Sequence, residues 1–257
     1  MSIKSKAVRD IQTLLNRDHG FNLKLDGDFG PPTFWDDSAT VNAVLTTLEK
    51  TGGPLEREPD ATPAVVKSDR TVFIEIGHGH KPGGFDPGAV RSGTGVTEHH
   101  LNGVVADAMS KRLSELGIES EIGDANLSNY SSGQAAKGHD VLISVHHNSH
   151  TDGSKAQGAE AIYDPRTKNP KSDKRLSALI SEAMADANGI ADRGAKQRRL
   201  SVLSGGRAVG VPYSSLIECY FVQRRPDPLP ATNEMELWSR RAGVAAANAI
   251  AQFLETV

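Results

Sequence analysis

The sequence has a single cysteine, Cys219, among its 257 residues. An intramolecular disulfide and a cluster of thiolate metal ligands are therefore both excluded, and any metal must be bound by His, Asp or Glu. The net charge of -3 provides no field that would recruit nucleic acid or an anionic membrane surface. No segment approaches the roughly 20 apolar residues of a membrane span, so membrane insertion is not expected either.

The hydrophobic pattern divides the chain into two parts joined by a linker. Residues 1–50 contain two short amphipathic helical patterns on either side of a Gly- and Pro-rich turn at 25–33, which predicts a small α-helical module. Residues 51–69 lose this pattern and carry Gly, Pro and charges, which is typical of a linker; an ordered surface loop is the alternative. Residues 70–257 are long enough to form a domain of their own.

Apolar β-rich runs alternate with helical patterns in residues 70–257. Strands are predicted over 71–76, 141–145, 159–163, 200–203 and 214–221. Helices are predicted over 98–116, from an N-cap at Ser172 to Gly189, and from a capping box of Asn233 and Glu236 through Phe253. This alternation predicts an α/β fold, with a twisted, mainly parallel (mixed) sheet flanked by helices.

Histidines are concentrated in one part of the chain, because eight of the nine lie between positions 78 and 150. His78 follows the first predicted strand and stands between two glycines, and His146 ends the second. Ligand sites in α/β sheets form beyond the carboxyl ends of strands, so we expect these two imidazoles to be neighbours. On this evidence four other histidines remain alternatives: His80, His99, His147 and His150.

Two glutamates are candidates for the same site. Glu98 begins a predicted helix and, taken alone, is typical of a first-turn acid favoured by the helix dipole. Glu218 lies in an apolar run, where an ionised carboxylate is costly unless it is paired or faces a cation; a salt bridge to an arginine is the alternative. A catalytic zinc takes three His or carboxylate ligands and an open position for water, and a nearby carboxylate moves the proton. His78, Glu98 and His146, with Glu218 as the base, satisfy this requirement without being singled out by it.

Five groups of motifs in residues 71–256 carry a resemblance to a known family. They stand in this order: Gly77-His78-Gly79 with Asp86-Pro87-Gly88-Ala89; Thr97-Glu98 leading into Leu101-Asn102; Leu142-Ile143-Ser144-Val145-His146-His147-Asn148; Arg193-Gly194-Ala195-Lys196 with Leu200-Ser201-Val202-Leu203; and Leu216-Ile217-Glu218. In this order they resemble the zinc-dependent N-acetylmuramoyl-L-alanine amidases, the family of bacterial cell-separation amidases and many phage lysins.

The resemblance implies a site and a reaction. It implies that His78, Glu98 and His146 bind Zn²⁺ and that Glu218 is the catalytic carboxylate. It prefers His146 to His147, because the family's ligand histidine lies two residues before the asparagine. The implied substrate is peptidoglycan, and the implied reaction is hydrolysis of the amide bond between N-acetylmuramic acid and the first L-alanine of the stem peptide.

The sequence departs from the family pattern at two places. The usual Asp-Pro before Gly-His-Gly is replaced by Glu75-Ile76, and we expect Glu75 to orient His78 as a hydrogen-bond acceptor. The usual Gly-Phe after the catalytic glutamate is replaced by Cys219-Tyr220-Phe221. We expect Cys219 to be a small buried residue rather than a nucleophile, because the neighbouring acid raises its pKa. Both departures concern substrate preference more than the type of reaction.

Residues 7–48 resemble, more loosely, the small helical peptidoglycan-binding modules found beside such enzymes. The residues that carry this resemblance are Val8, Leu14-Leu15, Asp26-Gly27-Asp28-Phe29-Gly30 and Ala43-Val44. The segment 34–38 before the second helix departs from the usual spacing. A merely structural helical cap is the alternative to a wall-binding role.

The beginning of the sequence bears on where the protein acts. Residues 1–6 lead straight into a polar helical pattern without an apolar stretch of signal-peptide length. We therefore expect synthesis in the cytoplasm without a signal peptide and action on the cell wall after release or export, as for a phage or prophage endolysin. Two other functions stay open: a zinc peptidase acting within the stem peptide or cross-bridge, and a non-catalytic wall-binding protein. The oligomeric state is not set by the sequence.

Overall fold

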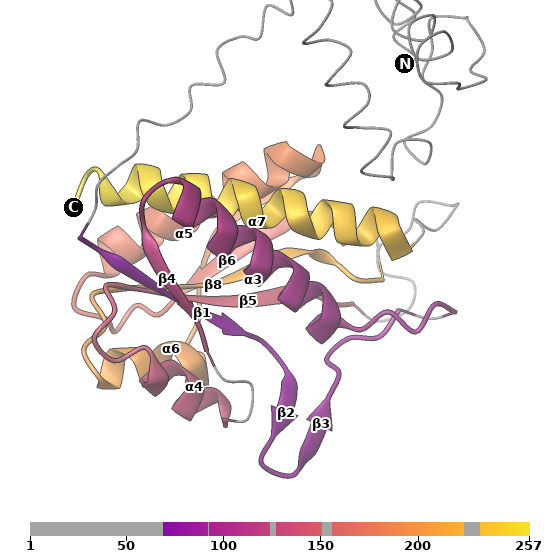
Figure 1. Cartoon of the computed structure of the whole chain (residues 1–257), viewed down its shortest axis with the longest axis horizontal. Coiled ribbons are helices and arrows are strands. Elements are labelled where there is room, and N and C mark those ends of the chain that lie inside the picture. Colours follow the sequence, from indigo (N-terminus) through magenta and orange to yellow (C-terminus); the bar gives the residue numbers. More distant parts are fainter. Residues whose placement is uncertain (1–68, 92, 124–126, 151–155, 224–231) are drawn as a thin grey trace, which may run out of the picture. The chain divides into compact units, whose positions relative to one another are not determined.

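A computed structural model of the chain describes residues 69–91, 93–123, 127–150, 156–223 and 232–257 (Figure 1). The predicted helical module of residues 1–50 lies outside these ranges, and so does the predicted linker of residues 51–69 apart from its last residue. Both assignments therefore stay predictions. No helix in the described ranges is long and apolar enough to cross a membrane.

Six strands form one sheet in the order β4-β1-β5-β8-β6-β7. Strand β6 runs antiparallel to β8, and the other neighbouring pairs are parallel. The predicted α/β fold with a mainly parallel, mixed sheet is confirmed. The bounds of the strands are β1 Thr71–Ile76, β4 Glu119–Ile122, β5 Val141–Asn148, β6 Ala159–Tyr163, β7 Asp192–Gln197 and β8 Tyr213–Phe221.

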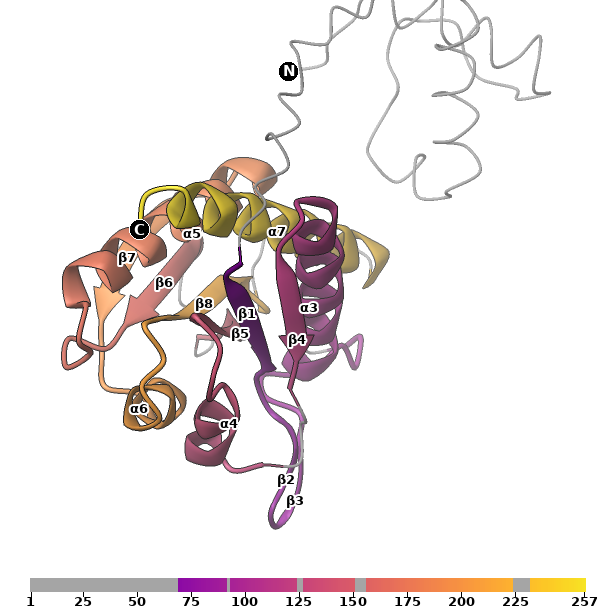
Figure 2. The ribbon, with the colours of Figure 1, turned by 60° about the vertical axis from the view of Figure 1, so that its left-hand side comes forward.

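Helices cover both faces of this sheet (Figures 1 and 2). The long helices α3 (Glu98–Glu115), α5 (Pro170–Asn188) and α7 (Thr232–Leu254) pack on one face. The shorter helices α4 (Asn129–Ala135) and α6 (Ser201–Ala208) pack on the other. The two faces therefore carry separate cores, a large one under the long helices and a small one under the short pair.

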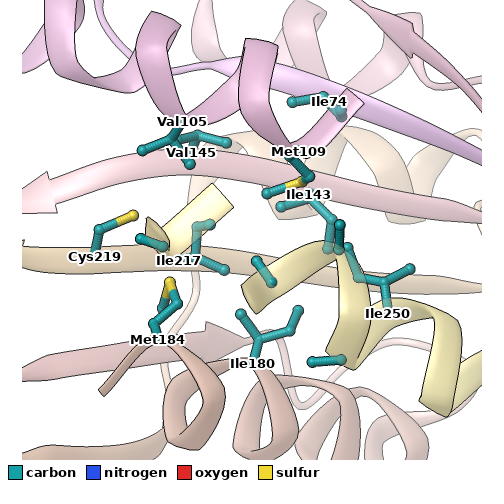
Figure 3. Packing of buried hydrophobic residues seen from close by; sticks show 14 of the residues in the cluster. Ile74, Val105, Met109, Ile143, Val145, Ile180, Met184, Ile217, Cys219 and Ile250 are labelled. Atoms are coloured by element: carbon teal, nitrogen blue, oxygen red, sulfur yellow. The ribbon is translucent and has the colours of Figure 1, made fainter. Parts of the chain in front are cut away.

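Successive strand residues alternate between these two cores, as the twofold period of a strand requires. In β1, Val72 and Ile74 join the large core, and Phe73 joins the small one. Figure 3 shows the large core, where Ile143, Ile217 and Cys219 of the sheet face side chains of the long helices. The side chain of Cys219 is fully buried there, which confirms the expectation that it is a core residue.

A two-stranded hairpin follows β1 and extends away from the main sheet (Figure 2). It consists of β2 (Gly79–Lys81) and β3 (Gly84–Asp86), paired antiparallel. Gly83 in the turn between them and Gly84 at the start of β3 have φ angles of 114° and 134°, a region that residues with a Cβ rarely adopt. The hairpin brings Asp86 back beside the end of β1.

Two predictions of local structure were wrong. Residues 200–203 are not a strand: Leu200 is the N-cap of α6, and the residues after it are helical. Ser172 is not the N-cap of α5, because the helix begins at Pro170 after the N-cap Asn169. Proline is favoured in the first turn of a helix, where its missing N–H is not needed.

The ends of the remaining predicted helices agree more closely. Gly189 ends α5 in the left-handed conformation, as predicted. Helix α7 begins at Thr232, one position before Asn233, whose side chain lies outside the described part of the chain. The proposed capping box at Asn233 therefore stays a prediction.

Candidate metal centre

Three of the predicted site residues converge at the carboxyl ends of β1 and β5. His78 follows β1, His146 lies near the end of β5, and Glu98 opens α3. One ligand atom from each lies within 4.8 Å of the others. A single carboxylate oxygen, Glu98 Oε1, is 3.0 Å from His78 Nε2 and 3.0 Å from His146 Nδ1. Among the described residues these three form a group that can hold a metal ion.

The backbone around His78 is shaped to fit this cluster. His78 has a φ of 66°, and it is the one non-glycine residue with a positive φ in the described ranges. Such a conformation costs about 1–2 kcal/mol and persists only where the surroundings enforce it. The glycine before it is required by close approach, because a Cβ on Gly77 would lie 2.4 Å from the ring of His146.

Glu98 is held in place by backbone donors. Its Oε2 accepts a hydrogen bond from the N–H of Ala89 at 3.0 Å, and its Oε1 accepts one from the N–H of His147 at 3.1 Å. Its side chain is 5% exposed. Thr97 is the N-cap of α3, so Glu98 is also a first-turn acid at the positive end of the helix dipole. Glu98 can therefore be both a first-turn acid of α3 and a metal ligand.

The second nitrogen of His78 is held by an aspartate from the hairpin. Asp86 Oδ2 lies 2.8 Å from His78 Nδ1, and Asp86 Oδ1 accepts a hydrogen bond from the N–H of Gly88 at 3.0 Å. The expectation that Glu75 orients His78 was wrong. Glu75 accepts a hydrogen bond from Ser144 Oγ at 2.6 Å and forms an ion pair with Lys81 at 3.7 Å.

Hydrogen bonds and charges within the cluster shift the titration of its members. Burial lowers the pKa of His78, but hydrogen bonds and charge from Glu98 and Asp86 outweigh it and raise this pKa to about 9. Burial also opposes the raised pKa of His146, where Glu98 again prevails. For Glu98, burial would raise the pKa, but hydrogen bonds with the two imidazoles hold it well below its usual range.

The structure separates the other candidate histidines from this cluster. His147 points to the opposite side, where its Nδ1 lies 2.7 Å from Asn102 Oδ1 and its burial lowers its pKa to about 3. His99 Nδ1 contacts the carbonyl of Gly77 at 3.1 Å. His80 and His150 lie against the rings of Phe85 and Phe221. The same Asn102 donates to the carbonyl of Gly77 at 3.1 Å, so it connects the two strand ends behind the cluster.

Glu218 lies on β8, directly beside the cluster. It is the register partner of His146 on β5 and of Glu160 on β6. Its Oε2 is buried and has no hydrogen-bond partner among the described residues. Burial, together with the negative charges of Glu98 and Glu160, raises the pKa of Glu218 to about 7, although His146 and Arg198 oppose the shift. The predicted alternative, a salt bridge to an arginine, is not found in the described ranges, where Arg193 pairs with Glu160 instead.

The donor set fits a catalytic metal ion. Two imidazoles and one carboxylate are the ligands that a catalytic zinc or a similar divalent ion uses, with one position left for water. The side chains of His78 and His146 are 25% and 18% exposed, so the cluster is open to solvent on one side. Glu218 supplies a buried carboxyl whose raised pKa suits proton transfer near neutral pH.

An α/β sheet that presents such a cluster at its strand ends, beside an acid of raised pKa, is typical of the class of metal-dependent hydrolases. Within that class, residues 72–253 match the model of the family described as N-acetylmuramoyl-L-alanine amidase. The chain belongs to this family. No curated protein matches the sequence.

Solved structures share the fold. An N-acetylmuramoyl-L-alanine amidase from Clostridium difficile is 23% identical, with a TM-score of 0.62 over 73% of this chain and 97% of that one. The amidase AmiC2 of Nostoc punctiforme is 20% identical, with a TM-score of 0.60 over 74% and 99% of the two chains. The catalytic domain of the CD27L endolysin is 20% identical, with a TM-score of 0.52 over 70% and 97%. At these identities the likeness shows the fold alone.

Proposed function

We propose that this protein hydrolyses the amide bond between N-acetylmuramic acid and the first L-alanine of the peptidoglycan stem peptide, with a zinc ion held by His78, Glu98 and His146. Membership of the amidase family supports the reaction. The observation that carries the site is the convergence of three ligand atoms within 4.8 Å, beside the buried carboxyl of Glu218.

Each side chain has a separate task in this proposal. When bound, zinc supplies a Lewis acid that polarises the scissile carbonyl and acidifies a water molecule. Asp86 accepts from Nδ1 of His78, which leaves Nε2 of the ring directed at the cluster. Glu218 takes a proton from the attacking water and transfers it to the nitrogen of the departing alanine. A group with a pKa of about 7 can carry a proton in both directions at neutral pH.

Digestion of purified peptidoglycan tests the proposal. Wild type with stoichiometric zinc should solubilise sacculi, whereas a chelator and the Glu218→Gln variant should each abolish activity. Full activity in either of those two samples would overturn the zinc–carboxylate mechanism. The control for the Glu218→Gln sample is its far-UV circular dichroism, which should match that of wild type because the substitution preserves size and shape.

The chemistry of the product separates the amidase from its alternatives. The newly freed amine should belong to an N-terminal alanine. Any other N-terminal residue would identify a peptidase acting within the stem peptide or the cross-bridge. Wild type that leaves sacculi undigested in the presence of stoichiometric zinc would identify a non-catalytic wall-binding protein.

We further propose that the enzyme acts as a phage or prophage endolysin that accumulates inside the cell and reaches the wall when the membrane is breached. The resemblance of residues 7–48 to peptidoglycan-binding modules is compatible with this role. Cells that express the protein should stay intact until a membrane-permeabilising agent is added. Lysis without such an agent would indicate an export route and contradict the endolysin role.

A further inference from the structure

The sheet face that carries the metal centre continues past Glu218 into a second group of charged residues. His146, Glu218 and Glu160 occupy neighbouring register positions on β5, β8 and β6. Their side chains share the face of Leu142 and Leu216, on which the small core lies. Beyond β6 the sheet ends with β7 (Figure 2). The metal centre therefore has polar neighbours on the β6–β7 side.

Two arginines surround the carboxylate of Glu160 in this group. Glu160 is 1% exposed, and its Oε2 accepts a hydrogen bond from Arg193 Nε at 2.7 Å. Its other oxygen accepts from Asn148 Nδ2 at 3.2 Å and lies 3.8 Å from Arg198 Nη2. Arg193 also lies over the ring of Phe221, at 5.3 Å from its centroid. Each oxygen of the buried carboxylate thus accepts one hydrogen bond, from Arg193 or from Asn148.

Arg198 differs from Arg193 in its access to solvent. Its side chain is 57% exposed, against 35% for Arg193. Its distance of 3.8 Å from Glu160 is that of an ion pair without a close hydrogen bond. The guanidinium is therefore held near Glu160, while more than half of the side chain stays accessible to solvent and so to a ligand.

The proposed reaction predicts which part of the substrate lies on this side of the metal centre. A residue that protonates the leaving nitrogen must lie within hydrogen-bond reach of it, so the peptide half of the substrate lies on the Glu218 side of the metal centre. In the order β5-β8-β6-β7, the next elements on that side are β6 and β7. The departing peptide therefore leads towards Glu160, and the muramic acid lies on the opposite side. Arg198 follows β7, where its N–H donates to the carbonyl of Tyr163 at 3.1 Å, and its side chain reaches back to within 3.8 Å of Glu160.

We infer that Arg198 binds a carboxylate of the departing stem peptide, with Glu160 holding the guanidinium over the site. A planar guanidinium pairs with a carboxylate through two parallel hydrogen bonds, which fixes the direction of the bound group. This inference rests on the proposed amidase function. It assigns Arg198 a part in substrate specificity.

Steady-state kinetics on two soluble substrates test the inference. One is N-acetylmuramoyl-L-alanyl-D-glutamate, and the other is the same compound with both carboxyl groups amidated. Arg198→Gln should raise KM for the acid about tenfold, the loss of one charge-assisted hydrogen-bonded contact, and any change in kcat should be the same on both compounds. On the amidated compound its KM should equal that of wild type. Arg199→Gln is the matched control, since it removes the same charge from the exposed neighbouring residue and should leave both substrates unaffected.

The outcomes distinguish this inference from the proposed function. If wild type hydrolyses both compounds and Arg198→Gln changes KM for both equally, or for neither, the inference is overturned and the amidase function stands. An equal rise in KM for the acid with Arg199→Gln would show that the effect comes from general positive charge, and it would also overturn the inference. If wild type releases neither L-alanyl-D-glutamate nor its amidated form, the proposed function fails and the inference fails with it. Selective loss on the acid with Arg198→Gln alone supports it.

Discussion

Replacing Gly77 by alanine should disable metal binding through a single methyl group. The substitution is compatible with the backbone, because Gly77 is not among the residues with positive φ. Its only direct effect is steric, since the new Cβ would lie 2.4 Å from Cε1 and Nε2 of His146 and 2.7 Å from Cδ2. The methyl group must therefore push the imidazole of His146 away, or move the end of β1 together with His78.

The expected loss of zinc affinity follows from how far the ring of His146 or the end of β1 must move. Ordinary contact begins at 3.4 Å, so a ring atom at 2.4 Å must move by about 1 Å. Metal–ligand distances tolerate only about 0.2 Å, so the displaced residue no longer contributes a normal bond. Loss of an outer-shell partner already costs about 10–100-fold in metal affinity, and misplacing a ligand itself should cost at least about 100-fold, or about 2.7 kcal/mol.

Zinc affinity of Gly77→Ala is measured by competition with a chromophoric chelator, and the fold is checked by circular dichroism and thermal denaturation. Gly103→Ala is the matched control: it adds the same methyl group within α3, where nothing lies within 4 Å. The control should bind zinc normally and be more stable by about 0.5–1 kcal/mol, because alanine is the better helix former. Zinc binding by Gly77→Ala with wild-type affinity would refute the steric argument.

Two further predictions concern Asp86 and Asp173. Asp86→Ala removes the acceptor of His78 Nδ1 and should weaken zinc binding about 10–100-fold in the same titration, and unchanged affinity would exclude an orienting role. Burial raises the pKa of Asp173 to about 6, so its contribution to stability is full below about pH 4 and is lost as the pH rises through 6. Relative to wild type, Asp173→Asn should therefore gain about 2 kcal/mol between about pH 4 and pH 8 in urea denaturation; a constant difference would contradict this.

The sequence predicts those strands whose residues are buried on both faces. In β1, β5 and β6 nearly every side chain is buried, so the apolar run itself marks the strand. The strands of the main sheet that were not predicted, β4 and β7, are its two edge strands; β4 is mostly exposed and β7 mostly half-buried. Edge strands are identified by their pairing partners, which a local sequence pattern does not contain. The same holds for the exposed strand β3 of the hairpin.

Helix α6 shows how tertiary packing overrides a local pattern. The residues at its start, 200–203, read as a short apolar strand. In the structure a Cβ on Gly205 would lie 2.0 Å from the carbonyl of Tyr130, and a Cβ on Gly133 would lie 1.9 Å from the carbonyl of Val202. These glycines let α4 and α6 approach backbone to backbone, and this contact favours the helix. Neither segment shows the contact when its sequence is read alone.

The candidate site was predictable to different extents from residue to residue. Strand ends indicate His78 and His146, but family motifs were needed to choose them from their neighbours and to raise Glu98 above a helix-dipole acid. The motif that contains Asp86 does not by itself indicate a role for this residue. The glycine pair at positions 83 and 84 is a hairpin signal, however, and a hairpin there predicts that Asp86 lies close to His78. Glu75 was assigned that role wrongly, because it lies within β1 on the face that Ser144 occupies in β5.

The direction of β6 decides what lies beside the carboxyl of Glu218. Because β6 runs antiparallel to β8, its first residues reach the edge where β8 ends, and Glu160 becomes the register partner of Glu218. A parallel β6 would place Tyr163 at this edge and Glu160 at the far one, away from the metal centre. The same reversal brings the start of β7, with Arg193, to this edge, since β7 runs parallel to β6. The placement of Glu160 and Arg193 beside Glu218 is therefore a consequence of one antiparallel pair in a sheet that is otherwise parallel.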